Sequence, residues 1–264
     1  MARMIGDIKF TGSVGDLTFY QLPTSKRIIV RKRKGPSKKD IQTKRCYEFT
    51  RYLNSEWRAV VMAGKTVRLA FHELKLMTGR HCTGRLHKLF KKIQPDDTVN
   101  EYGKRSVLIS HSPQKVEGFN FSTTPFSEIF SYPLDCKIDR ETGTMNLKLP
   151  MVTPGVQLNN PERYVMYRFI VGLAAVPDII YRPKDSAYVS AVSPVPPALA
   201  EYTEWFSYKL GNDAQDIEMQ LKNWVNPPSV SVMAGIAIEF GTPVSSRVVD
   251  SVKNAGGSMI LKVV

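Results

Sequence analysis

The sequence predicts an α+β protein with two parts: a small N-terminal β-meander packed on basic helices, and a C-terminal, mostly antiparallel, β-sandwich-like domain. Short β-type segments open the chain, helical periodicity follows, and spaced β-type segments separated by turn residues fill the remainder. A chain of 264 residues is also long for one compact core. We therefore expect a boundary near residue 111, which divides residues 1–110 from residues 111–264.

The N-terminal meander is predicted over residues 5–33. Residues 8–10, 17–22 and 27–33 have strand composition, and Gly, Ser, Pro and Thr separate them. In the last of these segments Ile28 and Val30 alternate with Arg27, Ile29, Arg31 and Arg33, so one face can pack while the other presents guanidinium groups. Such a small sheet needs a packing partner, and we expect the helices that follow to supply it.

A helix is predicted to begin at Ser37, because Ser37 and Asp40 have the spacing of a capping box. Apolar residues then recur every three or four positions with basic residues between them, which predicts an amphipathic helix with a basic outer side. Gly64 is expected to interrupt or kink this helix before Val67, Phe71 and Leu74 continue the apolar pattern. A further short basic helix is predicted over residues 86–93. The apolar positions of the first helix are Phe49, Leu53, Trp57, Val60 and Val61.

The second half of the chain has mostly β-type patterns. A proline-rich stretch, residues 181–200, is predicted to be a long loop, and residues 213–218 are predicted to form an acidic loop and the start of a helix. The turn residues between the β-type segments have the intervals typical of a sandwich. Strands are predicted over residues 132–138, 145–149, 164–176, 202–210, 230–240 and 259–264.

Positive charge is concentrated in the first two fifths of the chain. The first 110 residues hold 24 Lys and Arg against 9 Asp and Glu, whereas the rest hold 13 against 15. This asymmetry indicates an anionic partner, and a solvated basic face that only aids solubility is the alternative interpretation. The candidate polyanion- or partner-binding residues are Lys26, Arg27, Arg31, Lys32, Arg33, Lys34, Lys38, Lys39, Lys44, Arg45, Arg51, Arg58, Lys88, Lys91 and Lys92.

Four segments of the chain together resemble a group of uncharacterised bacterial proteins. These proteins have a Gly-rich FY-type hairpin, a helical segment rich in Arg and Lys, and a β-sandwich-like domain at the end. The resemblance implies an architecture, and it implies no activity and no functional residues. The segments are GSVGDLTFYQL, IIVRKRKGPSKKDIQT, RYLNSEWRAVVMAGKTVR and NPERYVMYRFIVGLAAVPD.

The motifs that suggest catalysis or metal binding are incomplete. Residues 59–66, AVVMAGKT, have the spacing of a relaxed phosphate loop, but they read as helical and lack a Gly-rich cradle. His72, His81, Cys82 and His87 lie close in sequence, yet their spacing matches no standard zinc site, which favours structural or surface histidines. Cations beside Cys82 would favour its thiolate, but no base is evident. We therefore expect no enzymatic activity, no metal and no cofactor.

The three cysteines are widely spaced and odd in number, which argues against a disulfide framework and favours a reducing compartment. The opening residues contain no apolar stretch typical of a signal peptide, and no apolar run is long enough to span a bilayer. These features predict a cytoplasmic protein without a membrane span.

Two functional hypotheses follow. The first is a non-enzymatic structural or assembly subunit, a homo-oligomer or part of a larger assembly, in which the basic arm docks on an acidic surface. The second is binding of nucleic acid through its phosphate backbone without sequence specificity.

Overall fold

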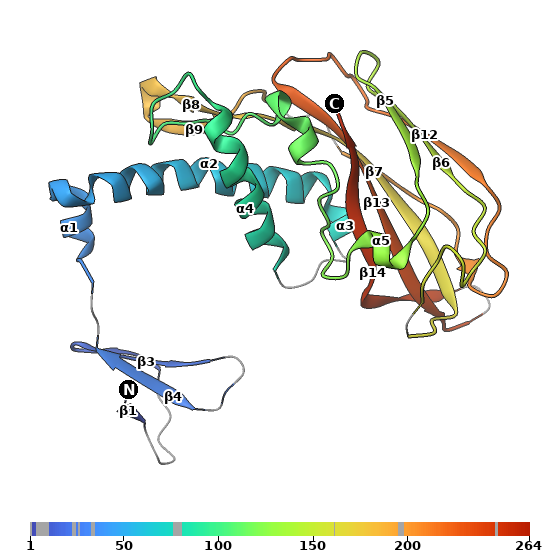
Figure 1. The fold of residues 1–264 in the computed structure, drawn as a ribbon, viewed down its shortest axis with the longest axis horizontal. Helices are drawn as coiled ribbons and strands as arrows, with labels where there is room; N and C mark the ends of the chain where they lie inside the picture. Colours follow the sequence, from blue (N-terminus) through green and yellow to red (C-terminus); the bar gives the residue numbers. More distant parts are fainter. Residues whose placement is uncertain are drawn as a thin grey trace. The chain divides into compact units, whose positions relative to one another are not determined.

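The computed structural model describes residues 2–3, 11–22, 25, 27–32, 35–75, 81–160, 162–194, 198–245 and 248–264 (Figure 1). The fold is α+β with several antiparallel sheets, which confirms the predicted class. The chain divides into two compact units, Met1–Arg51 and Tyr52–Val264. The boundary predicted near residue 111 therefore lies inside the second unit.

The first unit contains a four-stranded antiparallel sheet with the order β1-β4-β3-β2. A two-residue turn joins β2 to β3, and its Gly15 has φ of 54°, a left-handed conformation that glycine adopts without strain. Two of the predicted strands are confirmed as β3 and β4, and the one predicted over residues 8–10 lies outside the described residues. The strands are β1 (Ala2–Arg3), β2 (Gly12–Val14), β3 (Leu17–Gln21) and β4 (Ile28–Lys32).

The capping box predicted at Ser37 is present at the start of α1 (Lys38–Thr43). The backbone N–H of Asp40 donates to Ser37 Oγ over 3.0 Å, and the N–H of Ser37 donates to Asp40 Oδ2 over 3.1 Å. The helix ends at Thr43 with Lys44 as its C-cap, and a 3-10 turn, Arg45–Tyr47, leads to the next helix.

The next described helices are α2 (Glu48–Ala70), α3 (His72–Lys75) and α4 (Cys82–Ile93). α2 continues without a break through Gly64, so the predicted interruption is wrong. Here Gly64 allows α4 to approach, because a Cβ atom at this position would lie 2.9 Å from the ring of His87. The short basic helix predicted over residues 86–93 is confirmed as part of α4.

Among the described residues of the second unit, the strands form two sheets and one hairpin. The large sheet has the order β10-β7-β13-β14, with β11 also paired to β7, and the small sheet has the order β12-β6-β5. β8 and β9 form the hairpin, and α5 (Phe126–Ile129) precedes the small sheet. The strands are β5 (Asp135–Asp139), β6 (Thr144–Leu149), β7 (Met166–Pro177), β8 (Ile179–Arg182), β9 (Ala187–Ser190), β10 (Leu199–Tyr202), β11 (Phe206–Ser207), β12 (Gln215–Gln220), β13 (Val230–Pro243) and β14 (Val249–Val263).

Three local predictions in this half are wrong. The strand expected over residues 202–210 is split into β10 and β11, because the hydroxyl of Thr203 accepts the N–H of Phe169 and interrupts the ladder. The acidic segment at residues 213–218 lies in and before β12, where Ile217 and Met219 face the core and the acids alternate outward. The loop expected over residues 181–200 contains β9.

The second unit has three layers, with α2 and α4 on one face of the large sheet and the small sheet on the other (Figure 1). The two sheets pack face to face, which gives the sandwich-like arrangement that the sequence predicts. Because β7 and β13 are covered on both faces, almost every residue in them is buried, and they read as continuous apolar runs. The helical layer shares its core with these strands.

Two glycines that face each other across β7 and β13 let α3 approach the sheet. Gly172 pairs with Gly235 in the ladder. A Cβ atom would lie 3.0 Å from Leu74 Cδ1 at Gly172, and 2.8 Å from Leu74 Cδ2 at Gly235. This bare stretch of sheet therefore accommodates Leu74 and the neighbouring ring of Phe71.

Candidate docking surfaces

The described basic residues in and before β4 are exposed. Arg31 and Lys32 lie at the end of β4, and Arg27 precedes the strand. The Arg31 guanidinium lies 5.6 Å from the centre of the Tyr20 ring, a cation–π contact that orders the group without neutralising it. The predicted site residues Lys26, Arg33 and Lys34 lie outside the described residues.

The basic residues around α1 have different surroundings. Lys38, Lys39 and Arg45 are exposed, whereas Lys44 forms an ion pair of 2.6 Å with Asp40. Hydrogen bonds, first from Lys44 and then from Ser37, hold the pKa of Asp40 down to about 2. Arg51 binds within the chain, where its guanidinium donates to the carbonyls of Ile41 and Lys44 over 2.8 and 2.9 Å. Arg51 therefore holds the turn between α1 and α2 together.

In the second unit the structure separates the predicted basic residues into two classes. Arg58, Lys88 and Lys92 are exposed, whereas the Lys91 ammonium donates to the buried Glu56 carboxylate over 2.7 Å. No acidic residue occurs in α2 after Glu56, or in α4. Sequence reasoning did not select Lys65, which is exposed on α2, although its position in this acid-free run was a usable signal.

The first part of the apolar stripe predicted for α2 faces mostly outward, which corrects the sequence interpretation there. Leu53, Trp57 and Val61 are 45%, 45% and 39% exposed, and among the stripe positions within residues 53–61 only Val60 is buried. The later positions of the predicted pattern are buried as expected: Val67, Phe71 and Leu74. Around residues 53–61 the helix instead buries an adjacent face that includes several small residues and one ionised group, so hydrophobicity alone selected the wrong side there. The buried residues are Glu56, Ala59, Val60, Ala63, Gly64 and Val67.

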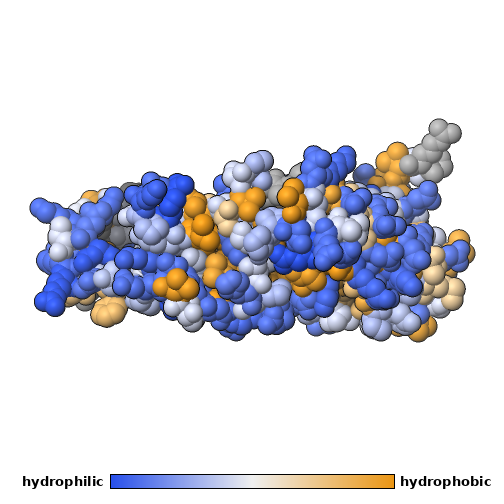
Figure 2. Space-filling view, turned by 90° about the horizontal axis from the view of Figure 1, so that it is seen from above, coloured by the Kyte–Doolittle hydropathy of each residue, from blue (hydrophilic) through white to orange (hydrophobic). Residues whose placement is uncertain are grey.

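We use the name α2–α4 face for a set of exposed residues on these two helices: Leu53, Trp57, Arg58, Val61, Lys65 and Lys88. The Trp57 ring meets the His87 ring of α4 edge to face, with 5.5 Å between centres. Burial and the nearby Arg68 lower the pKa of His87, so this side chain adds no charge at neutral pH. In the view of Figure 2, hydrophobic residues form small patches among hydrophilic ones.

The buried Glu56 fixes the helical layer beneath this face. Arg105 donates to both carboxylate oxygens over 2.6 and 2.9 Å, and the N–H of Gly103 donates over 3.0 Å. Desolvation alone would raise the pKa of Glu56, but the hydrogen bonds from Arg105 and Lys91 lower it to about 2. Arg105 and Lys91 therefore have structural roles, and Lys91 is not available to a partner.

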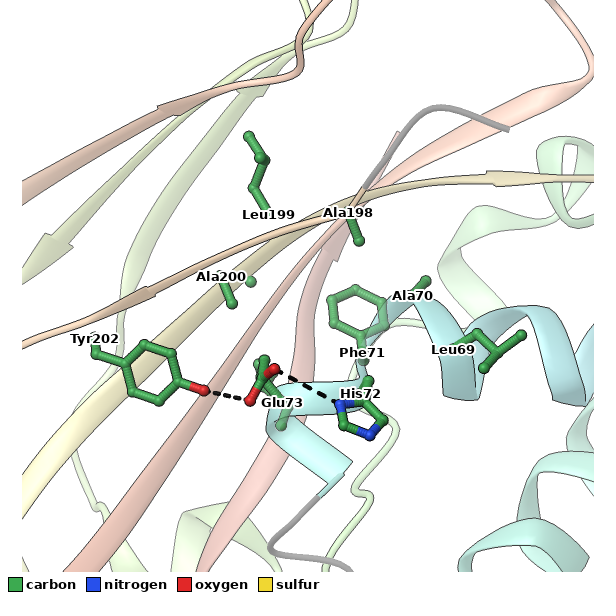
Figure 3. A pocket seen from close by; sticks show the side chains of 11 residues that line it. Leu69, Ala70, Phe71, His72, Glu73, Ala198, Leu199, Ala200 and Tyr202 are labelled. Atoms are coloured by element: carbon green, nitrogen blue, oxygen red, sulfur yellow. Dashed lines mark hydrogen bonds and ion pairs between the residues drawn. The ribbon is translucent and has the colours of Figure 1, made fainter. Parts of the chain in front are cut away.

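A pocket of about 300 Å³ lies between the end of α2, α3 and β10 (Figure 3). The Tyr202 hydroxyl donates to the Glu73 carboxylate, and His72 Nδ1 lies 3.6 Å from the same group. Burial raises the pKa of Tyr202, which keeps this hydroxyl protonated and able to donate. Ala198, Leu199 and Ala200 line the opposite wall, so the pocket combines an apolar side with one carboxylate that already has two partners.

The cysteine and histidine candidates are dispersed in the fold. Cys82 is buried in the core of the helical layer, and His72 and His81 are exposed. Within the described parts of the chain, no three His, Cys, Asp or Glu side chains lie close enough to hold a metal ion. The AVVMAGKT segment lies inside α2, where helical hydrogen bonds use the backbone amides that a phosphate loop would present.

Comparison of the chain with protein-family models, with curated proteins and with solved structures finds no match. Among the described residues, no helix combines the length and the apolar character needed to cross a membrane.

Proposed function

We propose that this protein is a non-enzymatic structural or assembly subunit that uses its basic N-terminal arm and helices to dock on acidic partners or neighbouring subunits. The observation that carries the proposal is the composition of the α2–α4 face. There, three exposed apolar side chains lie among exposed cations on two helices without an acidic residue after Glu56. Protein partners bind through apolar contact area combined with charges of opposite sign, whereas binding of a phosphate backbone requires mainly cations.

Nucleic-acid backbone binding is the second candidate, and the observation in its favour is on the N-terminal sheet. Arg31 lies over Tyr20 beside the exposed Lys32, so a cation and an aromatic ring are available together. Single-stranded nucleic acids bind to surfaces of this kind through phosphate contacts and base stacking.

Size-exclusion chromatography with light scattering and a 260 to 280 nm absorbance ratio, at low and high salt, tests the proposal. We expect an oligomer, or a complex with acidic protein, that carries no nucleic-acid absorbance. Changing Arg31 and Lys32 to Ala should shift the protein from this assembly towards the monomer. A wild-type monomer that releases nucleic acid only at high salt would support the second candidate and contradict the first.

A further inference from the structure

We infer that the α2–α4 face binds an acidic amphipathic helix of a partner protein. This inference rests on the proposed docking function and specifies the partner's chemistry. The starting observation is geometric: Leu53, Trp57, Val61 and Lys65 follow one another at intervals of four residues along α2. Such residues form a single row on a helix. From Leu53 to Lys65 the row extends about 18 Å at 1.5 Å per residue, or about three turns of a partner helix.

The apolar members of this row are the anchor points. Trp57 is 45% exposed and is held in place by the edge-to-face contact with His87, so its position is fixed before binding. Leu53 and Val61 lie one helical turn to either side of it. A helix with apolar residues at i, i+4 and i+7 presents a matching stripe, which is the usual way in which helices dock on helical surfaces.

The charges around the row select an acidic partner. Arg58 and Lys65 belong to α2, and Lys88 of α4 follows His87 in the sequence, which is the residue that contacts Trp57. All three are exposed, and none has an ion pair among the described residues. Carboxylates that flank the apolar stripe of a partner helix would meet these cations.

The same features disfavour two other occupants. A second copy of this face in a two-fold dimer would bring the basic residues of both copies together, where like charges repel. Nucleic acid would use the cations and one stacking ring, that of Trp57, but the aliphatic side chains of Leu53 and Val61 offer no surface on which bases stack. An acidic amphipathic helix uses both the apolar row and the cations.

The test uses the full chain and a synthetic 18-residue helical peptide with Leu at i, i+4, i+7 and i+11 and Glu on both flanks. Binding is measured by calorimetry, and the helix content of the peptide by circular dichroism. We expect binding that weakens with salt, together with a gain in helix content. Two control peptides, one with Lys in place of Glu and one with Ser in place of Leu, should bind at least tenfold more weakly.

Variants of the protein locate the binding surface. We expect Trp57→Ala, Val61→Ser and Lys88→Glu each to weaken peptide binding at least tenfold, which corresponds to about 1.4 kcal/mol. The matched control is Lys137→Glu on the exposed side of β5, which should leave binding unchanged. Because all four positions are partly or fully exposed, unfolding midpoints in urea should confirm that each variant folds.

The outcomes separate this inference from the proposed function. If Lys88→Glu abolishes binding but Trp57→Ala and Val61→Ser do not, the surface recognises charge alone and the helix inference is overturned, while docking on anionic partners stands. Equal binding of the Glu and Lys peptides also overturns the inference. If neither the peptides nor heparin, a non-helical polyanion, binds to the wild type, the proposed function fails as well.

Discussion

The two faces of the large sheet are closed in different ways. On the helical side, Gly172 and Gly235 leave the sheet bare so that α3 can approach, and the buried Glu56 links α2 to α4 and to Arg105. On the other side, large apolar side chains such as Leu147 and Phe169 fill the space between two sheets. The helical side therefore depends on close approach and on ionic hydrogen bonds, and the sandwich side depends on volume.

This difference has consequences for tolerance to change. A sandwich core accepts exchanges that conserve volume at little cost, because no polar partner is lost. A buried ion and a glycine contact accept very few substitutions, since one added or removed group leaves a charge unpaired or atoms in collision. The helical side is also the side that carries the α2–α4 face, so this packing positions the surface proposed for docking.

The largest effect is expected for Glu56→Ala on the helical side. The change removes the acceptor for Arg105, Lys91 and the N–H of Gly103 at once. Breaking a buried ion pair by removing one partner typically costs about 3–5 kcal/mol, and we expect about 4 kcal/mol here. The free energy of unfolding from urea titration at pH 7 provides the measurement.

Glu218→Ala serves as the control for this change, because Glu218 is exposed on β12. It should alter the free energy of unfolding by about 0.5 kcal/mol or less. If Glu56→Ala had as small an effect as this control, the ionic links would not determine the stability of the helical side.

The second effect is expected on the sandwich side. Leu147 is fully buried between the sheets, and Leu147→Ala should lower the free energy of unfolding by about 3 kcal/mol through lost apolar burial and a residual cavity. Leu147→Met, which nearly conserves volume, should cost less than about 1.5 kcal/mol. Urea titrations of both variants measure the contrast, and equal losses would show that volume is not the controlling factor on this side.

The sequence predicted the sandwich side better than the helical side, for a physical reason. β6, β7 and β13 are recognisable because their apolar patterns reflect their burial directly. The buried face of α2 includes Glu56 and Gly64, whose partners lie in α4 and in residues 103–105, so no local pattern could identify it. For this reason the sequence predicts Trp57 in a packed stripe, and it identifies the surface proposed for docking only partly, through Arg58 and Lys88.

The third effect concerns the glycine contact. In Gly235→Ala the new methyl group would lie 2.8 Å from Leu74 Cδ2 and 3.2 Å from the backbone oxygen of Met259. We expect a loss of about 2 kcal/mol, since overpacking a core costs about 1–3 kcal/mol. Gly84→Ala is the matched control. Gly84 lies in α4, and a Cβ atom added there would have no other atom within 4 Å.

The control should give the opposite sign. Alanine is favoured over glycine in a helix interior by about 0.8–1.0 kcal/mol, so Gly84→Ala should raise the free energy of unfolding by up to that amount. Thermal or urea unfolding of both variants provides the comparison. A gain in stability for Gly235→Ala would contradict the close approach of α3 to the sheet.

The smallest effect is expected from mild acid, through His87 at the contact between α2 and α4. Burial, followed by the charge of Arg68, lowers the pKa of His87 below its ordinary value of 6.5. The unfolded chain therefore binds this proton first, and the contribution of His87 to stability falls as the pH drops below 6.5 towards the folded-state pKa. Urea unfolding at several pH values between 7.5 and 5 measures this loss.

The substitution His87→Gln should remove this part of the pH dependence, because glutamine does not titrate and has a similar size. The control is Asn54→Gln, an exchange of uncharged side chains at an exposed position of α2, which should keep the pH slope of the wild type. Subtracting the His87→Gln profile from the wild-type profile cancels the contribution of other groups. These include Asp178, because burial raises the pKa of its carboxyl group. If the slopes of His87→Gln and the wild type coincided, protonation of His87 would not weaken the packing of α4 on α2, and Trp57 would keep its support in mild acid.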